Sequence, residues 1–222
     1  MTRAGMGPPD SSRHARSASE LLYAAVAGLA GPSVPTGFPS VDNLLGGGLR
    51  RGDLVVLGGD AGSGKSALAL AIALRTCASG HRVLYCTGEM NAARVAERAV
   101  AMEARVSIDQ LRREPGAQLV RETLVRLEQY LPQIHTVSQG KLATAAAVVR
   151  KTRPALTVLD PLTHLTQQAG VAGVQCSALD VLRLKDLARK TETAILAIVG
   201  FGSVLFTYFG VNFWLSGLHS YV

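Results

Sequence analysis

The sequence predicts an α/β fold in which a mostly parallel β-sheet carries helices on both faces. Two observations lead to this prediction. Short apolar segments typical of buried strands alternate with longer segments of helical periodicity. The first of these strands also runs into a glycine-rich stretch that a strong helix former follows at once. A chain of 222 residues is long enough for one such domain with short appendages.

The glycine-rich stretch fits the phosphate-binding pattern G-x-x-x-x-G-K-[ST]. It consists of Gly59, Asp60, Ala61, Gly62, Ser63, Gly64, Lys65 and Ser66, and we predict that these eight residues bind ATP. Glycines let the backbone curl so that several N–H groups point at one phosphate chain, and the dipole of the following helix favours the anion. Lys65 is expected to reach the β- and γ-phosphates, and the Ser66 hydroxyl to hold Mg²⁺.

The segments that lead up to this loop are short. Residues 1–16 contain few large apolar groups and are expected to be disordered. Residues 17–29 are predicted to form a helix that opens with a capping box. Another short helix is expected over 40–45, followed by a glycine stop, and the apolar run 53–58 is the strand that enters the loop. The helix after the loop is expected over 66–74.

The remaining elements alternate in the same way. Strands are expected over 82–86, 134–137, 154–160 and 194–199, and helices over 91–103, 118–131, 142–151 and 177–191. A further helical turn or two is expected within 106–113, and a loop from 161 to 173. Helical spacing predicts three buried faces, which are Val95, Ala99 and Met102, then Val120, Leu124, Leu127 and Leu131, then Val181, Leu184 and Leu187. Glu122 is placed to pair with Arg126.

Two carboxylates follow strands whose carboxyl ends share an edge with the glycine-rich loop. Asp160 ends the strand over 154–160 and is predicted to hold Mg²⁺ together with Ser66. Glu89 follows the strand over 82–86 and is predicted to orient the attacking water or accept its proton. Each has a simpler alternative, because Asp160 also suits a turn or cap and Glu89 also suits a helix N-terminus.

Taken together, three segments resemble the RecA-type motor domain of DnaB-type replicative helicases. They are TGFPSVDNLLGGGLRRGDLVVLGG (36–59), CTGEMNAARVAERAVA (86–101) and LTVLDPLTHL (156–165), and the resemblance covers about 34–199. The lead-in also resembles the RadA and KaiC relatives of that family. The resemblance implies a RecA-like P-loop ATPase with ATP and Mg²⁺ as cofactors, Lys65 and Glu89 as catalytic residues, and Glu89 as the base. It further implies a homo-oligomeric ring, single-stranded DNA as a partner, a cytoplasmic location, and a linker helix at 17–33.

Residues 200–222 depart from that family. They hold most of the aromatic residues of the chain and no charged side chain. Their string FTYFGVN…GLHSY resembles the C-terminal end of cytochrome c assembly membrane proteins. The expected sensor and the basic residue that would act on the neighbouring subunit are absent from this stretch, so the ATPase domain is predicted to be incomplete at its C-terminal side and impaired in hydrolysis and DNA coupling. The tail itself is expected to be an apolar helix.

Three functions remain open from the sequence. The first is an ATP-binding domain of helicase descent, and the second is a nucleotide-switched binding module of the KaiC or RadA type. The third is a tail-anchored or non-functional chimera that contacts a membrane through 200–222, where 194–218 is uncharged and long enough to span a bilayer. The net charge of +7 is spread along the chain and permits an acidic partner without demanding one. Cys77, Cys86 and Cys176 form no metal-binding pattern and are expected to be fillers in a reducing compartment.

Overall fold

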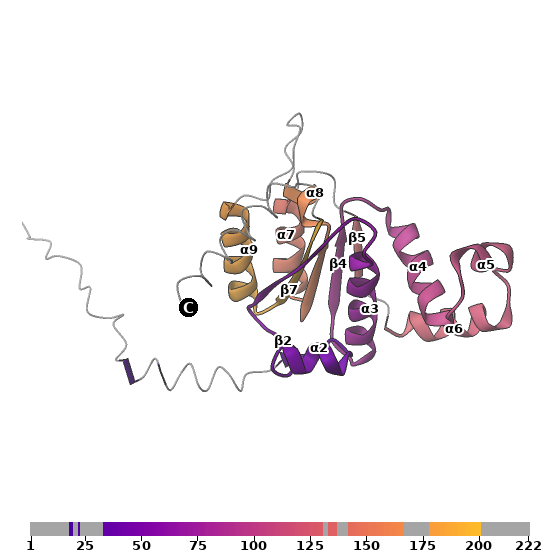
Figure 1. The fold of residues 1–222 in the computed structure, drawn as a ribbon, viewed down its shortest axis with the longest axis horizontal. Coiled ribbons are helices and arrows are strands. Elements are labelled where there is room, and N and C mark those ends of the chain that lie inside the picture. The colour runs from indigo at the N-terminus through magenta and orange to yellow at the C-terminus, as the bar shows by residue number, and fades with distance from the viewer. Residues whose placement is uncertain are drawn as a thin grey trace, which may run out of the picture. The chain divides into compact units, whose positions relative to one another are not determined.

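The computed structural model describes residues 33–130, 133–136, 142–166 and 178–200, together with Ala18, Ser19 and Leu22. The chain divides into the units Met1–Pro32 and Ser33–Val222. In the second unit, five strands form one parallel sheet in the order β3-β7-β6-β4-β5 (Figure 1). They are β3 (Leu54–Gly59), β4 (Val83–Thr87), β5 (Gln133–Thr136), β6 (Leu156–Asp160) and β7 (Ala194–Gly200). The predicted parallel sheet is therefore confirmed.

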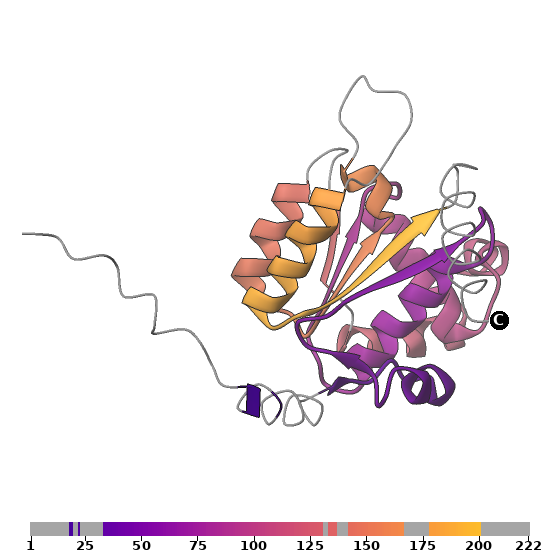
Figure 2. The same cartoon turned by 60° about the vertical axis from the view of Figure 1, so that its left-hand side comes forward.

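Helices cover both faces of this sheet, as the sequence predicts (Figures 1 and 2). One face packs against α3 (Lys65–Ala78), α4 (Ala92–Ala104) and α6 (Gln118–Glu128). The other packs against α7 (Leu142–Thr152), α8 (Leu162–Thr166) and α9 (Ala178–Thr191). A small separate cluster joins α4 and α6 to α5 (Ile108–Arg113).

The middle strands supply both hydrophobic cores because successive side chains of a strand point to opposite faces. In β4, Tyr85 belongs to the first core and Leu84 and Cys86 belong to the second. In β7, Ile195 and Leu196 divide in the same way. Burial raises the pKa of the Cys86 thiol to about 12, so this cysteine is a neutral core group, as a filler role requires.

The segment before β3 forms a small structure of its own. β1 (Ser33–Val34) pairs antiparallel with β2 (Leu49–Arg50), and α2 (Pro39–Leu44) lies between them in the chain. Gly48 has a φ of 118°, and a Cβ at this position would lie 2.7 Å from the carbonyl oxygen of Val34. This glycine of the lead-in is thus required for the close approach of two backbones.

In three helices, one residue that was predicted to be buried is exposed. Met102 in α4, Leu124 in α6 and Val181 in α9 are exposed, with relative exposures of 36%, 42% and 38%. Small side chains occupy the buried positions instead, because these helices lie close to their neighbours. These buried small residues are Ala101 and Ala104 in α4, Thr123 in α6 and Ala188 in α9.

Two further predictions need correction. Glu122 accepts a hydrogen bond from Gln118 at 2.8 Å, whereas Arg126 donates to the Glu103 carbonyl oxygen at 3.3 Å, so the expected pair of Glu122 with Arg126 does not form. The expected loop over 161–173 contains α8, because Leu162 and Leu165 are buried against the second core. Tertiary packing stabilises this short helix where periodicity gives no signal.

Some predictions fall outside the described residues. They are the disorder of 1–16, most of the helix over 17–29, Leu131, Cys176 and the apolar tail beyond Gly200; Ala18, Ser19 and Leu22 are helical. In the part of the chain that the structure describes, no helix has both the length and the apolar character needed to span a bilayer. Residues 194–199 form most of strand β7, as predicted.

Candidate functional site

The glycine-rich loop connects the end of β3 to the start of α3, as the motif requires. Gly62 and Gly64 have φ values of 77° and 87°, a left-handed backbone that favours glycine. At Gly59, a Cβ would lie 2.9 Å from Ser63 Oγ, so a side chain there would push into the loop. The Lys65 ammonium donates hydrogen bonds to the Asp60 carbonyl oxygen and to Ser63 Oγ. This ammonium therefore lies over the loop, where a phosphate chain would replace its present partners.

A hydrogen bond joins the loop to the carboxylate at the end of β6. The Ser66 hydroxyl donates to Asp160 Oδ1 at 2.9 Å across 94 residues of sequence. Tyr85, which is fully buried in β4, donates its hydroxyl to Asp160 Oδ2. Asp160 is only 2% exposed, so its carboxylate needs both of these donors.

The position of β7 explains how these groups meet. β7 lies between β3 and β6 and pairs parallel with both. Strand spacing of about 4.8 Å thus places the carboxyl ends of β3 and β6 about 10 Å apart, a gap that the Ser66–Asp160 hydrogen bond bridges. The peptide bond after Asp160 is cis.

Hydrogen bonds made by Thr87 and Gly88 fix the turn that carries Glu89. The Thr87 hydroxyl accepts from the Met90 N–H at 3.1 Å and donates to the Met90 carbonyl oxygen at 3.0 Å. The Gly88 N–H donates to the Asp160 carbonyl oxygen at 3.0 Å, which ties the end of β4 to the end of β6. Glu89 itself is exposed. The turn therefore holds its backbone while its carboxylate stays accessible.

A cleft of about 570 Å³ lies between the loop and the Glu89 turn at the carboxyl edge of the sheet. One wall is the start of α3 and its loop, and the other is the Glu89 turn and α4; the lining residues are Gly62, Gly64, Lys65, Ser66, Ala67, Glu89, Met90, Arg94 and Arg98. This volume is within the range of ligand sites. Ser66 and Asp160 offer a hydroxyl and a carboxylate oxygen side by side, which is the ligand type that Mg²⁺ uses alongside phosphates and waters. The residues present therefore fit this metal.

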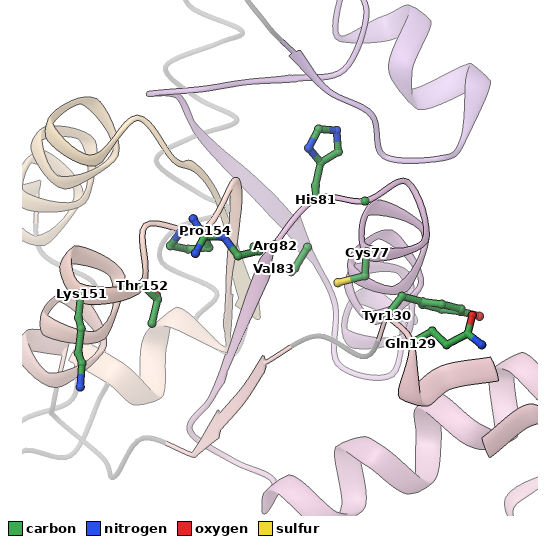
Figure 3. Close-up of a pocket in the computed structure, with 10 residues that line it drawn as sticks. Cys77, His81, Arg82, Val83, Gln129, Tyr130, Lys151, Thr152 and Pro154 are labelled. Atoms are coloured by element: carbon green, nitrogen blue, oxygen red, sulfur yellow. The ribbon is translucent and has the colours of Figure 1, made fainter. Parts of the chain in front are cut away.

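A second cavity of about 430 Å³ lies at the opposite edge of the sheet (Figure 3). His81, Arg82 and Lys151 are among its lining residues. α3, α6 and α7 each end close to it in sequence, at Ala78, Glu128 and Thr152. Helix C-termini carry partial negative charge and repel phosphate, so this cavity suits a nucleotide less well than the cleft at the loop.

Of the predicted site residues, Gly62, Gly64, Lys65, Ser66 and Glu89 line the cleft, and Asp160 contacts Ser66. Three further residues, which the sequence analysis missed, belong to the same region. Tyr85 contacts Asp160, and Arg94 and Arg98 line the cleft. Tyr85 gave no signal, because an aromatic residue in a buried strand is ordinary. The two arginines had a usable signal, since they stand four residues apart on the helix that follows Glu89 and so share a face.

Comparisons with known proteins agree with this fold. A family model described as the DnaB-like helicase C terminal domain matches residues 33–201. The chain is 31% identical over 173 residues to the DNA repair protein RadA of Pseudomonas aeruginosa, covering 75% of this chain and 32% of that protein. It is 29% identical over 168 residues to RadA of Mycobacterium tuberculosis, covering 75% and 30%. The chain thus spans about a third of the length of these curated relatives.

Two solved structures share the fold at 18% identity. One is an ATPase domain, which aligns with a TM-score of 0.66 over 82% of this chain and 69% of that chain. The other is a DnaB-like replicative helicase, solved in a study of its interactions with primase, which aligns with a TM-score of 0.69 over 82% and 46%. The RecA-like fold predicted from the sequence is therefore confirmed.

Proposed function

The chain belongs to the family of DnaB-like helicase C-terminal domains, which are RecA-like ATPases, and we propose that its cleft binds and hydrolyses ATP with Mg²⁺. The observation that carries this proposal is the hydrogen bond of 2.9 Å between Ser66 and Asp160. It joins a phosphate-loop hydroxyl to a strand-end carboxylate, as a magnesium nucleotide site requires.

Each cleft residue has a role in this proposal. The backbone N–H groups of residues 59–66 bind the phosphates, and the Lys65 ammonium reaches the β- and γ-phosphates. Ser66 and Asp160 hold Mg²⁺, which when bound neutralises charge on those phosphates. Glu89 is exposed on the opposite wall, where its carboxylate can orient the attacking water and accept its proton.

The Lys65→Ala variant tests the binding site. We expect its affinity for Mg-ATP to fall by about 10- to 100-fold, because a charge-assisted contact to phosphate is lost. Titration calorimetry of the wild type and the variant measures this. Lys151→Ala is the matched control, since Lys151 lines the cavity at the other edge and its loss should leave the affinity unchanged. Equal affinities in all three proteins would contradict the proposal.

We expect the hydrolysis itself to be slow. The sequence holds no Lys or Arg after Lys190, so a basic residue reaching the γ-phosphate of a neighbouring subunit is not supplied from that stretch. Steady-state phosphate release with and without single-stranded DNA measures the rate. Strong stimulation by DNA would show that the chain couples hydrolysis to DNA and would contradict this expectation.

A second candidate is a nucleotide-switched binding module that unwinds nothing. The similarity to RadA favours it. Both candidates include a homo-oligomeric ring, and single-stranded DNA is a partner only in the first. Light scattering with and without ATP, combined with a DNA-binding assay, separates them. ATP-dependent assembly without DNA affinity supports the binding module.

We make a separate proposal for residues 200–222. This apolar stretch either contacts a membrane or results from a frameshift or recombination that joined a foreign segment to the ATPase domain. The lack of charge in this stretch supports the membrane contact, and its departure from the helicase family pattern supports the join. Independent sequencing of the gene across codons 195–205, with translation in all frames, tests whether two sequences were joined. A sensor and a basic residue in another frame would show that the tail is an artefact. Fractionation tests the membrane contact, and a monodisperse product free of membranes would contradict it.

A further inference from the structure

Helix α4 places two arginine side chains on the wall of the cleft that faces the phosphate loop. Arg94 and Arg98 are four residues apart in α4 (Ala92–Ala104), so they lie on the same side of the helix. Both line the cleft together with Lys65 and the loop glycines, and both are exposed. The Asn91 side chain accepts a hydrogen bond from the Arg94 N–H at 2.8 Å, which fixes the start of the helix that carries them.

These two side chains are not engaged elsewhere in the described part of the chain. The nearest carboxylate on their own helix, Glu97, is held by Arg112 from α5 through contacts of 2.6 and 3.1 Å. No side-chain hydrogen bond or ion pair of Arg94 or Arg98 occurs among the described residues. Besides the hydrogen bond from Arg112, both arginines help to lower the pKa of Glu97 through their charges. Their guanidinium N–H groups nevertheless remain available to an anion in the cleft.

The charge of the cleft matches its proposed ligand. The lining residues Lys65, Arg94 and Arg98 carry three positive charges, and Glu89 carries one negative charge. Asp160, which is bonded to Ser66, adds a second negative charge beside them. The site therefore keeps a net charge of about +1, which attracts the net charge of about −2 on Mg-ATP. The charge of Arg98 also acts on Tyr85, the buried partner of Asp160. Burial and the charge of Asp160 raise the pKa of Tyr85 far above its ordinary value, and Arg98 acts in the opposite direction.

We propose that Arg94 and Arg98 bind the terminal phosphate of the nucleotide from within the same chain and thereby make the cleft prefer ATP to ADP. This inference rests on the proposed function of the cleft. The planar guanidinium fork suits phosphate oxygens better than an ammonium does. The alternative is an ordinary solvated helix face. The phosphate contact is favoured because both side chains line the same cleft as the phosphate loop.

The test compares affinities for Mg-ATP and Mg-ADP in the wild type, Arg94→Gln, Arg98→Gln and the double variant. Arg121→Gln is the control, because Arg121 is exposed on α6 and does not line the cleft. We expect each single variant to weaken ATP binding by about tenfold and to leave ADP binding within about twofold. Thermal unfolding checks that the variants fold, and Arg98→Lys should restore part of the preference because it keeps the charge.

The outcomes separate this inference from the function on which it rests. A wild type that binds neither nucleotide overturns both. A wild type that binds ATP while the double variant keeps the same ATP-to-ADP ratio overturns the inference alone. A ratio that falls toward one in the double variant, with Arg121→Gln unchanged, supports it.

Discussion

Tyr85 is the residue on which the geometry of the carboxylate depends. Its hydroxyl donates to one oxygen of Asp160, and the Ser66 hydroxyl donates to the other. Ser66 sits on the loop that a nucleotide would contact, whereas Tyr85 is fully buried in β4. Tyr85 therefore holds the carboxylate in place when Ser66 turns to a ligand.

We predict that Tyr85→Phe lowers the free energy of unfolding by about 1–3 kcal/mol, because it leaves one oxygen of a buried carboxylate without a donor. Urea denaturation measures the change. Tyr130→Phe is the control, since the Tyr130 hydroxyl contacts Glu103 at 3.2 Å in a partly buried position and should matter less. If both variants lower the free energy of unfolding by the same amount, the contact with Asp160 does not contribute more than an ordinary hydrogen bond.

The ion pair of Glu97 with Arg112 predicts a pH dependence. The hydrogen bond from Arg112 holds the pKa of Glu97 below its ordinary value. The pair therefore stabilises the fold above the unfolded pKa of about 4.3, and this contribution is lost as the pH falls through the lower folded pKa. Arg112→Gln should lower the denaturation midpoint at pH 7, and this loss should become smaller as the pH falls below about 4.3. If the difference in midpoint between the wild type and the variant stayed the same at every pH, this linkage would be contradicted. Added salt should reduce the difference at pH 7.

At the scale of the residue, the sequence predicts positions that belong to a local motif or to the end of a strand. Lys65, Ser66 and Asp160 follow from a motif and a strand end, and the structure brings Ser66 and Asp160 into contact. The chemical roles of these residues and of Glu89 stay predictions. Tyr85 could not be found, because its role comes from a neighbour 75 residues away in sequence. Such a contact leaves no local trace.

At the scale of the element, the sequence predicts that a helix exists better than it predicts which of its faces is buried. Their existence followed from periodicity, and their buried face depended on what lies opposite. In α9, Leu184 and Ala188 are buried and Val181 is exposed, although the apolar pattern favours Val181 over Ala188. Close contact with the sheet selects the smaller side chain, and hydropathy alone cannot indicate how close a helix will lie.

The two ends of α4 predict opposite effects on stability. Asn91 caps its start, and Arg105 ends it with a φ of 56°, where glycine is favoured. We expect Asn91→Ala to cost about 1 kcal/mol. Arg105→Gly should stabilise by about 0.5–1 kcal/mol, because it removes left-handed strain. Thermal and urea unfolding check both, and a destabilised Arg105→Gly variant would show that its side chain makes a compensating contact.

At the scale of the whole molecule, residues of the main cores should contribute more to stability than residues of the small cluster. Ile198 in β7 is 1% exposed in the core between β3 and β6, whereas Leu111 is 9% exposed in the small cluster under α5. We expect Ile198→Ala to cost about 2–5 kcal/mol and Leu111→Ala clearly less. Denaturation of both variants measures this. Equal losses would mean that the α4–α5–α6 region folds as one unit with the sheet.

The late place of β7 in the chain also bears on how the protein is made. β3 and the loop leave the ribosome early, yet the neighbour of β3 in the sheet is the last of the described strands to be translated. At about 5–20 residues per second, the loop waits on the order of ten seconds for that neighbour. During this interval the two halves of the cleft cannot take their final spacing, and the nascent chain offers an open strand edge to other chains. The rate of translation through residues 160–200 therefore becomes a variable in the yield of folded protein.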